Sequence, residues 1–294
     1  MSVQQTCKTI MMFWGCMIPT VEPYVEKATR YSLEKLGVRI IEMHEATCCP
    51  DPEISRTMGI DLWRTLAGRN ISIANMSKND ICVICNGCFD TLTKADYELR
   101  ENPRLSENVN NLLNRYNMKY DGSSRIYHMI EFLHDIVGVD RLSGSIKRNL
   151  HGLRCAPQYG CRILGEKSDL KMKFDRLITT IGGEIVHIRT ERLCCGVPAM
   201  YSDPEFALHQ RAEVKLKEIK EIGTDCIVLF CPACAERIER AEMALTSEGK
   251  EFNIPVLNYL ELLAICLGAG PDEIGAHLHR IQIDQTLDRI LRVE

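Results

Sequence analysis

The sequence predicts an α/β protein built from two similar domains, each with a parallel sheet covered by helices. Three observations lead to this prediction. A pattern of cysteines is duplicated along the chain, short apolar segments have the length of buried strands, and segments with helical periodicity lie between them. With 294 residues, of which 45% are hydrophobic, the chain is long enough to form two hydrophobic cores.

The cysteine pattern indicates an internal duplication. Five cysteines recur 145 or 146 residues further along the chain with nearly the same spacing. The first set is Cys16, Cys48, Cys49, Cys85 and Cys88, and the second set is Cys161, Cys194, Cys195, Cys231 and Cys234. Because such agreement over ten positions does not arise by chance, we expect an N-terminal domain over 1–145 and a C-terminal domain over 146–294.

The first half shows the alternation that a parallel sheet requires. Apolar segments at 8–14 and 38–42 predict buried strands, and the amphipathic segment at 21–36 predicts a helix between them. A third short apolar run at 80–84 predicts another strand, and a polar helix is expected at 89–100.

The second half repeats this order. Strands are predicted at 154–159, 184–188 and 225–230, and helices at 168–181 and 204–222. After Pro271, apolar residues recur at helical spacing among charged ones, which predicts a C-terminal amphipathic helix that covers its own domain.

The duplicated cysteines follow the predicted strands. One cysteine comes directly after each of four strands, and each Cys-Cys pair follows another strand by a short loop. In parallel α/β sheets, ligands and cofactors collect at the carboxyl ends of the strands. We therefore expect five sulfur atoms to converge at one edge of each sheet.

Fifteen cysteines require a chemical explanation. A disulfide framework is typical of small secreted domains, so reduced thiolates that hold a metal or a cluster are favoured here. CxxC alone fits zinc, iron–sulfur and redox dithiol sites. A tetrahedral zinc ion needs no fifth ligand, whereas a multi-iron cluster accommodates adjacent cysteines, so spacing favours iron–sulfur and leaves zinc open. The five cysteines outside the repeat are expected to be packing residues: Cys7, Cys82, Cys155, Cys226 and Cys266.

Composition argues against several other classes of protein. The net charge of −4 gives no support to a nucleic-acid-binding surface. No run of about 18 apolar residues predicts a membrane span, and no signal peptide is visible at the N-terminus. We expect a cytoplasmic protein.

The full pattern resembles a known family. C-x31-CC-x35-CxxC, repeated as C-x32-CC-x35-CxxC with Cys194-Cys195-Gly196, is similar to the cysteine-rich CCG domain, present twice. A two-copy chain of this length resembles the B-type subunit of heterodisulfide reductase. This resemblance implies two Rossmann-like domains related by pseudo-twofold symmetry and two noncubane [4Fe-4S] clusters. Carried over, each cluster is held by one of the two sets of five cysteines.

The same resemblance implies a function and partners. In the family, the disulfide of coenzymes M and B lies between the clusters. The S–S bond is expected to split homolytically, and electrons and protons then release two thiols. Electrons would come from the C-type subunit of heterodisulfide reductase, which has two cubane [4Fe-4S] clusters. That partner is supplied by the flavin-containing A-type subunit and ultimately by a hydrogenase or formate dehydrogenase. No G-x-G-x-x-G follows a strand here, which agrees with an external donor.

The substrate of the family is anionic, so basic residues near the second-half cysteines are candidates for binding it. These are Arg162, Lys167, Arg189 and Arg192. Arg162 departs from the family pattern, in which histidine commonly follows the cysteine. Two alternatives remain open: a CCG electron-transfer subunit of a fumarate, lactate, glycolate or glycerol-phosphate oxidoreductase, and a zinc-stabilised interaction scaffold.

Overall fold

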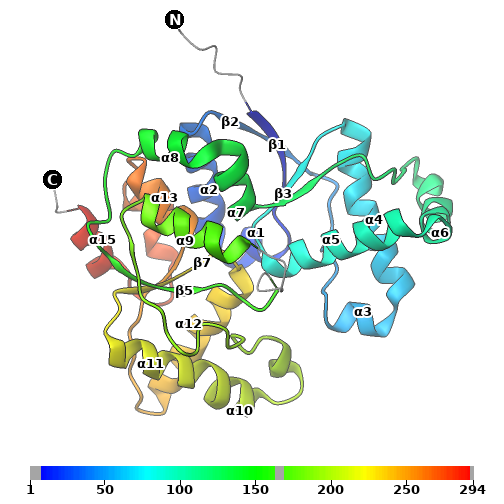
Figure 1. Ribbon diagram of the computed structural model, residues 1–294. Coiled ribbons are helices and arrows are strands. Elements are labelled where there is room, and N and C mark those ends of the chain that lie inside the picture. Colours follow the sequence, from blue (N-terminus) through cyan, green and yellow to red (C-terminus); the bar gives the residue numbers. More distant parts are fainter. Residues whose placement is uncertain (1–7, 163–168, 292–294) are drawn as a thin grey trace, which may run out of the picture.

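Two four-stranded parallel sheets form the centre of the protein, one in each half. The computed structural model describes residues 8–162 and 169–291 (Figure 1). The first sheet has the order β2-β1-β3-β4 and the second has the order β6-β5-β7-β8. The strands are β1 (Lys8–Phe13), β2 (Val38–Glu42), β3 (Ile81–Val83), β4 (Ile126–His128), β5 (Arg154–Gln158), β6 (Glu184–Ile185), β7 (Cys226–Leu229) and β8 (Val256–Asn258). The predicted duplicated α/β fold is confirmed.

Helices connect the strands and cover the sheets. In the first half they are α1 (Met17–Val21), α2 (Pro23–Lys35), α3 (Ile54–Met58), α4 (Ile60–Ser77), α5 (Asn86–Glu101), α6 (Pro103–Leu113), α7 (Met129–Glu131) and α8 (Val139–Ser145). In the second half they are α9 (Leu170–Thr180), α10 (Pro204–Ala207), α11 (Val214–Ile222), α12 (Pro232–Ser247), α13 (Tyr259–Cys266), α14 (Pro271–Ile274) and α15 (Asp284–Leu291). Short 3-10 segments occur at Asn114–Tyr116, Pro198–Tyr201 and Ala276–Leu278, and π-helical segments at Phe132–Gly138 and Leu208–Glu213.

The central strands are buried on both faces, as expected for a parallel sheet covered by helices. All residues of β3 and β7 are buried. Packing cysteines contribute to this core: Cys155 pairs in register with Cys226, and their sulfurs lie 3.9 Å apart. Cys82 and Cys266 are also buried. Cys7 lies outside the described residues.

The fourth strand of each sheet was not predicted. β4 and β8 have three residues each, which is too short for a period-2 pattern to be recognised. The predicted strand at 184–188 is shorter, because the chain leaves the sheet after Val186 donates its N–H to the Cys155 carbonyl at 2.8 Å. α5 begins at Asn86, inside the CxxC motif, rather than at Phe89.

The C-terminal segment differs from the predicted single helix. It is interrupted at Gly275, which has a φ of +71°, and continues into α15. Ile283, Leu287 and Ile290 are buried in the core, as an amphipathic helix requires. α14, however, packs on α2 of the first half as well as on α13, so this segment covers both halves instead of its own domain alone.

One hydrophobic core is shared by the two halves, and each half also has a smaller core of its own. α2 and α13 lie against each other in Figure 1, and Ser32 of α2 donates a hydrogen bond to the Leu260 carbonyl. One continuous cluster of buried side chains includes Ile10 and Met12 from the first sheet and Val228 from the second. This shared core fixes the carboxyl-end loops of both sheets relative to each other.

Candidate metal centre

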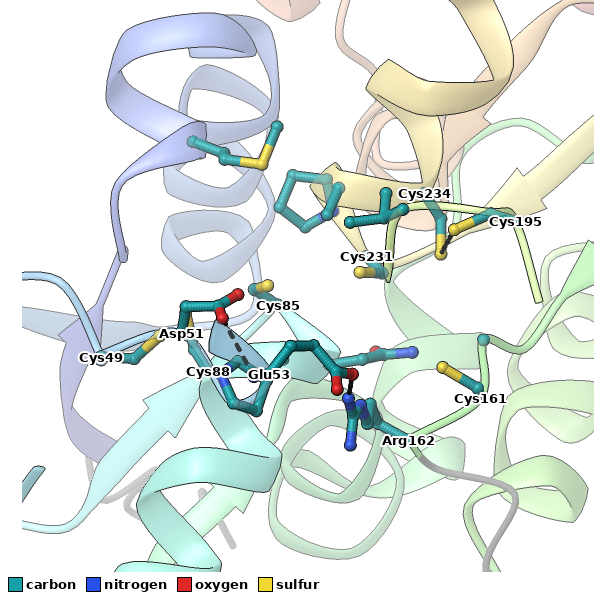
Figure 2. Close-up of a pocket in the computed structure, with 18 of the residues that line it drawn as sticks. Cys49, Asp51, Glu53, Cys85, Cys88, Cys161, Arg162, Cys195, Cys231 and Cys234 are labelled. Carbon is teal, nitrogen blue, oxygen red and sulfur yellow. Dashed lines mark hydrogen bonds and ion pairs between the residues drawn. The ribbon is translucent and has the colours of Figure 1, made fainter. Parts of the chain in front are cut away.

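All ten duplicated cysteines line one cavity between the two halves. The same cavity is lined by Trp14, Met17 and Asn86 from the first half and by Arg162 and Val197 from the second. Figure 2 shows Cys49, Cys85 and Cys88 of the first half on one side and the labelled cysteines of the second half on the other, with Cys85 and Cys231 facing each other. The structure therefore places the two sites expected from sequence next to each other in one cavity.

Three of the cysteines stand at the beginning of helices. Cys16 precedes α1, Cys85 precedes α5 and Cys231 precedes α12, each within three residues of the end of a strand. The unpaired N–H groups and the dipole at a helix N-terminus stabilise negative charge. At Cys231, interaction with Cys234 lowers the pKa and favours the thiolate, the form in which cysteine binds metals. Interaction with Cys48 raises the pKa of Cys16, and interaction with Cys231 raises that of Cys85.

Glycine is required before the first cysteine of each set. Gly15 and Gly160 occupy equivalent positions, with φ values of +70° and +78°. A Cβ at Gly15 would lie 3.0 Å from the Cys88 sulfur, and a Cβ at Gly160 would lie 2.4 Å from Asn86 Nδ2. The absence of a side chain at both positions lets the first CxxC segment approach both loops closely.

The two Cys-Cys loops are held by buried polar side chains. In the first half, Asn70 accepts from the Thr47 N–H at 2.9 Å and donates to the Cys48 carbonyl at 3.0 Å. In the second half, Glu218 accepts from the backbone N–H groups of Arg189 and Thr190 at 2.7 and 2.9 Å. Different residues thus shape the same loop in the two copies.

The sulfurs form a continuous row of neighbours. Each one interacts with the next in the order Cys16, Cys48, Cys49, Cys88, Cys85, Cys231, Cys234, Cys195, Cys194 and Cys161. The Cys195 and Cys234 sulfurs are 3.2 Å apart. Interaction with Cys48 lowers the pKa of Cys49, and interaction with Cys161 lowers the pKa of Cys194. Thiolate is therefore favoured at one member of each adjacent pair.

The arrangement of this row tests the zinc alternative. Four thiolates around one zinc ion would all lie about 3.8 Å from one another, given Zn–S bonds of about 2.3 Å. Among residues 8–162 and 169–291, no three sulfurs lie within 4.8 Å of one another. Five spread sulfurs per half, including both members of each Cys-Cys pair, fit a larger multi-iron cluster better than a single tetrahedral ion.

The predicted basic residues differ in whether they line the cavity. Arg162 lines the cavity, where its guanidinium forms an ion pair with Glu53 (Figure 2). The guanidinium also forms an ion pair with Asp90 at 3.2 Å. The side chain of Arg189 is 92% exposed and interacts with Glu218, and Arg192 is also exposed. Neither of these two is among the described residues that line the cavity. Lys167 lies outside the described residues.

Sequence reasoning missed one histidine beside the centre. His128 ends β4, is fully buried, and lies 3.0 Å from Asn86 through its Nε2 atom. Its Nδ1 atom accepts from the Ile130 N–H at 3.2 Å, and burial lowers its pKa to about 4. The internal duplication could have identified His128. Glu131 and Glu261 occupy equivalent positions in the two halves, and each forms a capping box with the residue three positions before it.

Comparisons with known proteins identify the family. The CCG cysteine-rich domain matches residues 10–93 and 155–239. The B-type subunit of a CoB-CoM heterodisulfide reductase from Methanosarcina acetivorans is 33% identical over 294 residues, covering 97% of both chains. The chain belongs to this heterodisulfide reductase family, with two CCG domains. This family membership identifies it as an oxidoreductase component with iron–sulfur clusters that works in a multi-subunit complex.

Two further matches have lower sequence identity. The membrane anchor subunit of an 8-methylmenaquinol:fumarate reductase from Wolinella succinogenes is 25% identical over 290 residues, covering 95% of this chain and 98% of its own. A crystal structure of a hypothetical protein from Helicobacter pylori has the same fold, with a TM-score of 0.77 at 16% identity. The match covers 94% of this chain and 52% of that one. Among the described residues, none of the helices has both the length and the apolar character needed to cross a bilayer.

Proposed function

We propose that this chain is the disulfide-reducing subunit of a heterodisulfide reductase, with the disulfide of coenzymes M and B as substrate. Its ten cysteines would hold two noncubane [4Fe-4S] clusters, one on each set of five. The observation that carries this proposal is the single cavity lined by both complete sets. A substrate with two sulfurs matches two adjacent and equivalent sites.

Each part of the cavity has a chemical task in this proposal. The clusters would supply iron sites for the two sulfurs and one electron each. The helix N-terminus at Cys231 and the interaction with Cys234, which lowers the pKa of Cys231, favour the thiolate there. Trp14, Met17 and Val197 give the cavity apolar walls, which exclude water and strengthen the electrostatic interactions within it. Arg162 is the cationic side chain of the described lining and is positioned to bind an anionic group.

The proposal requires an external electron donor. A partner with two cubane clusters, supplied by a flavin-containing partner and an upstream hydrogenase or formate dehydrogenase, would deliver electrons one at a time. Two such deliveries and two protons convert one disulfide into two thiols.

The first test is metal analysis of anaerobically purified protein. We expect about eight irons and eight acid-labile sulfides per chain, and about half of each in Cys49→Ala and in Cys195→Ala. The reduced protein should then convert the CoM–CoB disulfide to thiols with a reduced dye as donor. One or two zinc ions without sulfide would contradict the proposal and support a scaffold held together by zinc.

The ion pairs of Arg162 support a second candidate function. Glu53 and Asp90 already pair with this guanidinium, so an anionic substrate must compete with two carboxylates. If the chain only passes electrons within another oxidoreductase, as its similarity to a fumarate reductase component allows, no such competition arises. Full iron content without reduction of the anionic disulfide or of an uncharged one would favour this candidate.

A further inference from the structure

A single buried side chain connects the cysteine segments of the two halves. Asn86 lies inside the first CxxC motif and lines the cavity, yet its Nδ2 group donates to the Tyr159 carbonyl at 2.8 Å. Tyr159 directly precedes Gly160 and Cys161, the first cysteine of the second set. The missing side chain of Gly160 provides the space for this amide. Asn86 therefore links its own cysteine segment to one in the other half.

His128 fixes the orientation of that amide. Because its Nδ1 accepts from the Ile130 N–H, its Nε2 carries the proton and donates to Asn86 Oδ1 at 3.0 Å. The imidazole also makes edge contacts with Phe89, which follows Cys88, and with Phe230, which precedes Cys231. The ring thus contacts two segments, the first CxxC segment and the residue before Cys231, which adjoin cysteines of both sets.

The second half does not repeat this arrangement. Pro232 occupies the position equivalent to Asn86 and has no amide group to donate. Asn258, the counterpart of His128, caps its helix in the same way but donates its Nδ2–H to the Phe230 carbonyl at 3.0 Å, within its own half. Of these equivalent positions, only Asn86 in the first half donates a hydrogen bond to the other half.

We propose that Asn86 and His128 are positioning residues that set the distance between the two five-cysteine sites, so that both sites bind the two sulfurs of one disulfide together. This inference rests on the proposed function. The two sulfurs of a disulfide are about 2.05 Å apart, so two sites that share them must be spaced accurately. Functional groups need to be held within about 0.5 Å, and a displacement of about 1 Å costs on the order of 100-fold in rate.

The direct test is Asn86→Ala in the full chain loaded with iron and sulfide. We expect unchanged iron content and unchanged one-electron reduction by a dye, because all ten cysteines remain. The magnetic interaction between the two reduced clusters, measured by electron paramagnetic resonance, should change. The kcat for disulfide reduction should fall about 100-fold. Asn75→Ala is a matched control, since it removes a buried amide that bonds Ser124 and Asp121 within the first half alone.

Two substitutions of His128 separate positioning from helix capping. His128→Asn keeps a capping acceptor, as Asn258 does in the second half, but is too short to reach Asn86. His128→Gln retains an N–H for Asn86 and loses the cap. We expect the magnetic interaction and kcat to change in His128→Asn and to stay near wild type in His128→Gln. The opposite order would show that only the cap matters and would overturn the inference.

Failure of the inference can be distinguished from failure of the proposed function. Wild-type protein without iron, or with clusters but no disulfide reduction, contradicts the proposed function. Wild-type activity and magnetic interaction in both Asn86→Ala and His128→Asn contradict only the positioning role. Loss of about half the iron in Asn86→Ala would show that Asn86 supports its own site alone, which also overturns the inference.

Discussion

The two halves of the molecule have the same strand order and the same five cysteines, but they differ where they face each other. Met17 in the first half corresponds to Arg162 in the second, and both line the cavity. Asn86 corresponds to Pro232, and the amide bonds the opposite half while the proline provides no donor. The duplication has therefore preserved the pattern of cysteines, whereas the residues that would contact a substrate or the other half have diverged.

The two glycines that precede the first cysteine of each set provide the strongest test of this comparison. Gly160→Ala should cost more than Gly15→Ala. Each substitution imposes a positive φ on alanine, at about 1–2 kcal/mol. The new Cβ at Gly160 also collides with Asn86 Nδ2, and breaking that buried bond adds on the order of 1–3 kcal/mol. Urea unfolding of both variants measures the difference.

The same pair distinguishes local effects from effects between the halves. Gly15→Ala crowds the Cys88 sulfur and should reduce iron at the first site only. Gly160→Ala should disturb the contact between the halves and alter the magnetic interaction of the clusters. Equal loss of stability and of iron in the two variants would show that the halves are equivalent at these positions.

A second prediction concerns Glu22, a carboxylic acid of the first half that interacts with charged groups of the second half. Glu22 is fully buried, and neither of its oxygens has a hydrogen-bond partner among the described residues. Burial raises its pKa to about 9, and the charges of Glu239, Cys231 and Glu261 add to this effect, while Arg280 opposes it. Glu22 is therefore a neutral acid in the folded protein at pH 7.

Glu22→Gln should remove a pH dependence of stability. Because the pKa of Glu22 is higher in the folded state, binding of its proton stabilises the fold. This contribution is complete below the unfolded pKa of about 4.5 and is lost as the pH rises through the folded pKa of about 9. The variant should match wild type near pH 4.5 and be more stable by about 3 kcal/mol at pH 7. Denaturant unfolding at several pH values checks this, and parallel curves for the two proteins would show that Glu22 is ionised.

Much of this architecture could be predicted because it depends on local patterns. The strands β1 and β2 and the convergence of five cysteines at each sheet follow from apolar runs and from the rule that parallel strands end at one edge. The fourth strands could not be predicted, since three residues carry no clear period. The spacing of the cysteines also could not show that the two sets share one cavity, which depends on how α2 and α13 pack.

The polar contacts of the site depend on distant parts of the chain. Asn86 and His128 are 42 residues apart, and Asn86 and Tyr159 are 73 apart, so no local pattern reveals either bond. Arg189 and Arg192 are close to Cys194 in sequence, yet both side chains are exposed to solvent. Of the three basic candidates that the structure describes, each chosen because it is near a duplicated cysteine in sequence, only Arg162 lines the cavity.

The smallest expected effect tests the pair Met17 and Arg162. Arg162→Met gives the cavity two similar apolar walls and removes its described cationic lining residue. If Arg162 binds an anionic group of the substrate, KM for the CoM–CoB disulfide should rise about 10-fold, equivalent to about 1.4 kcal/mol. KM for an uncharged disulfide should change little, or fall, because the apolar wall is extended. Iron content should not change, since no cysteine is altered.

Arg162→Met also leaves Glu53 and Asp90 without their shared partner, so a loss of stability must be separated from a loss of binding. Arg189→Ala serves as the control, because it removes an exposed guanidinium from the same half without affecting the cavity wall. We expect KM in this control to stay within about twofold of wild type, as for most exposed charges. A similar rise in KM for both disulfides in Arg162→Met would indicate that the arginine shapes the cavity through Glu53 and Asp90. In that case, the difference between Met17 and Arg162 would affect the packing of the cavity wall and not the binding of a charged substrate.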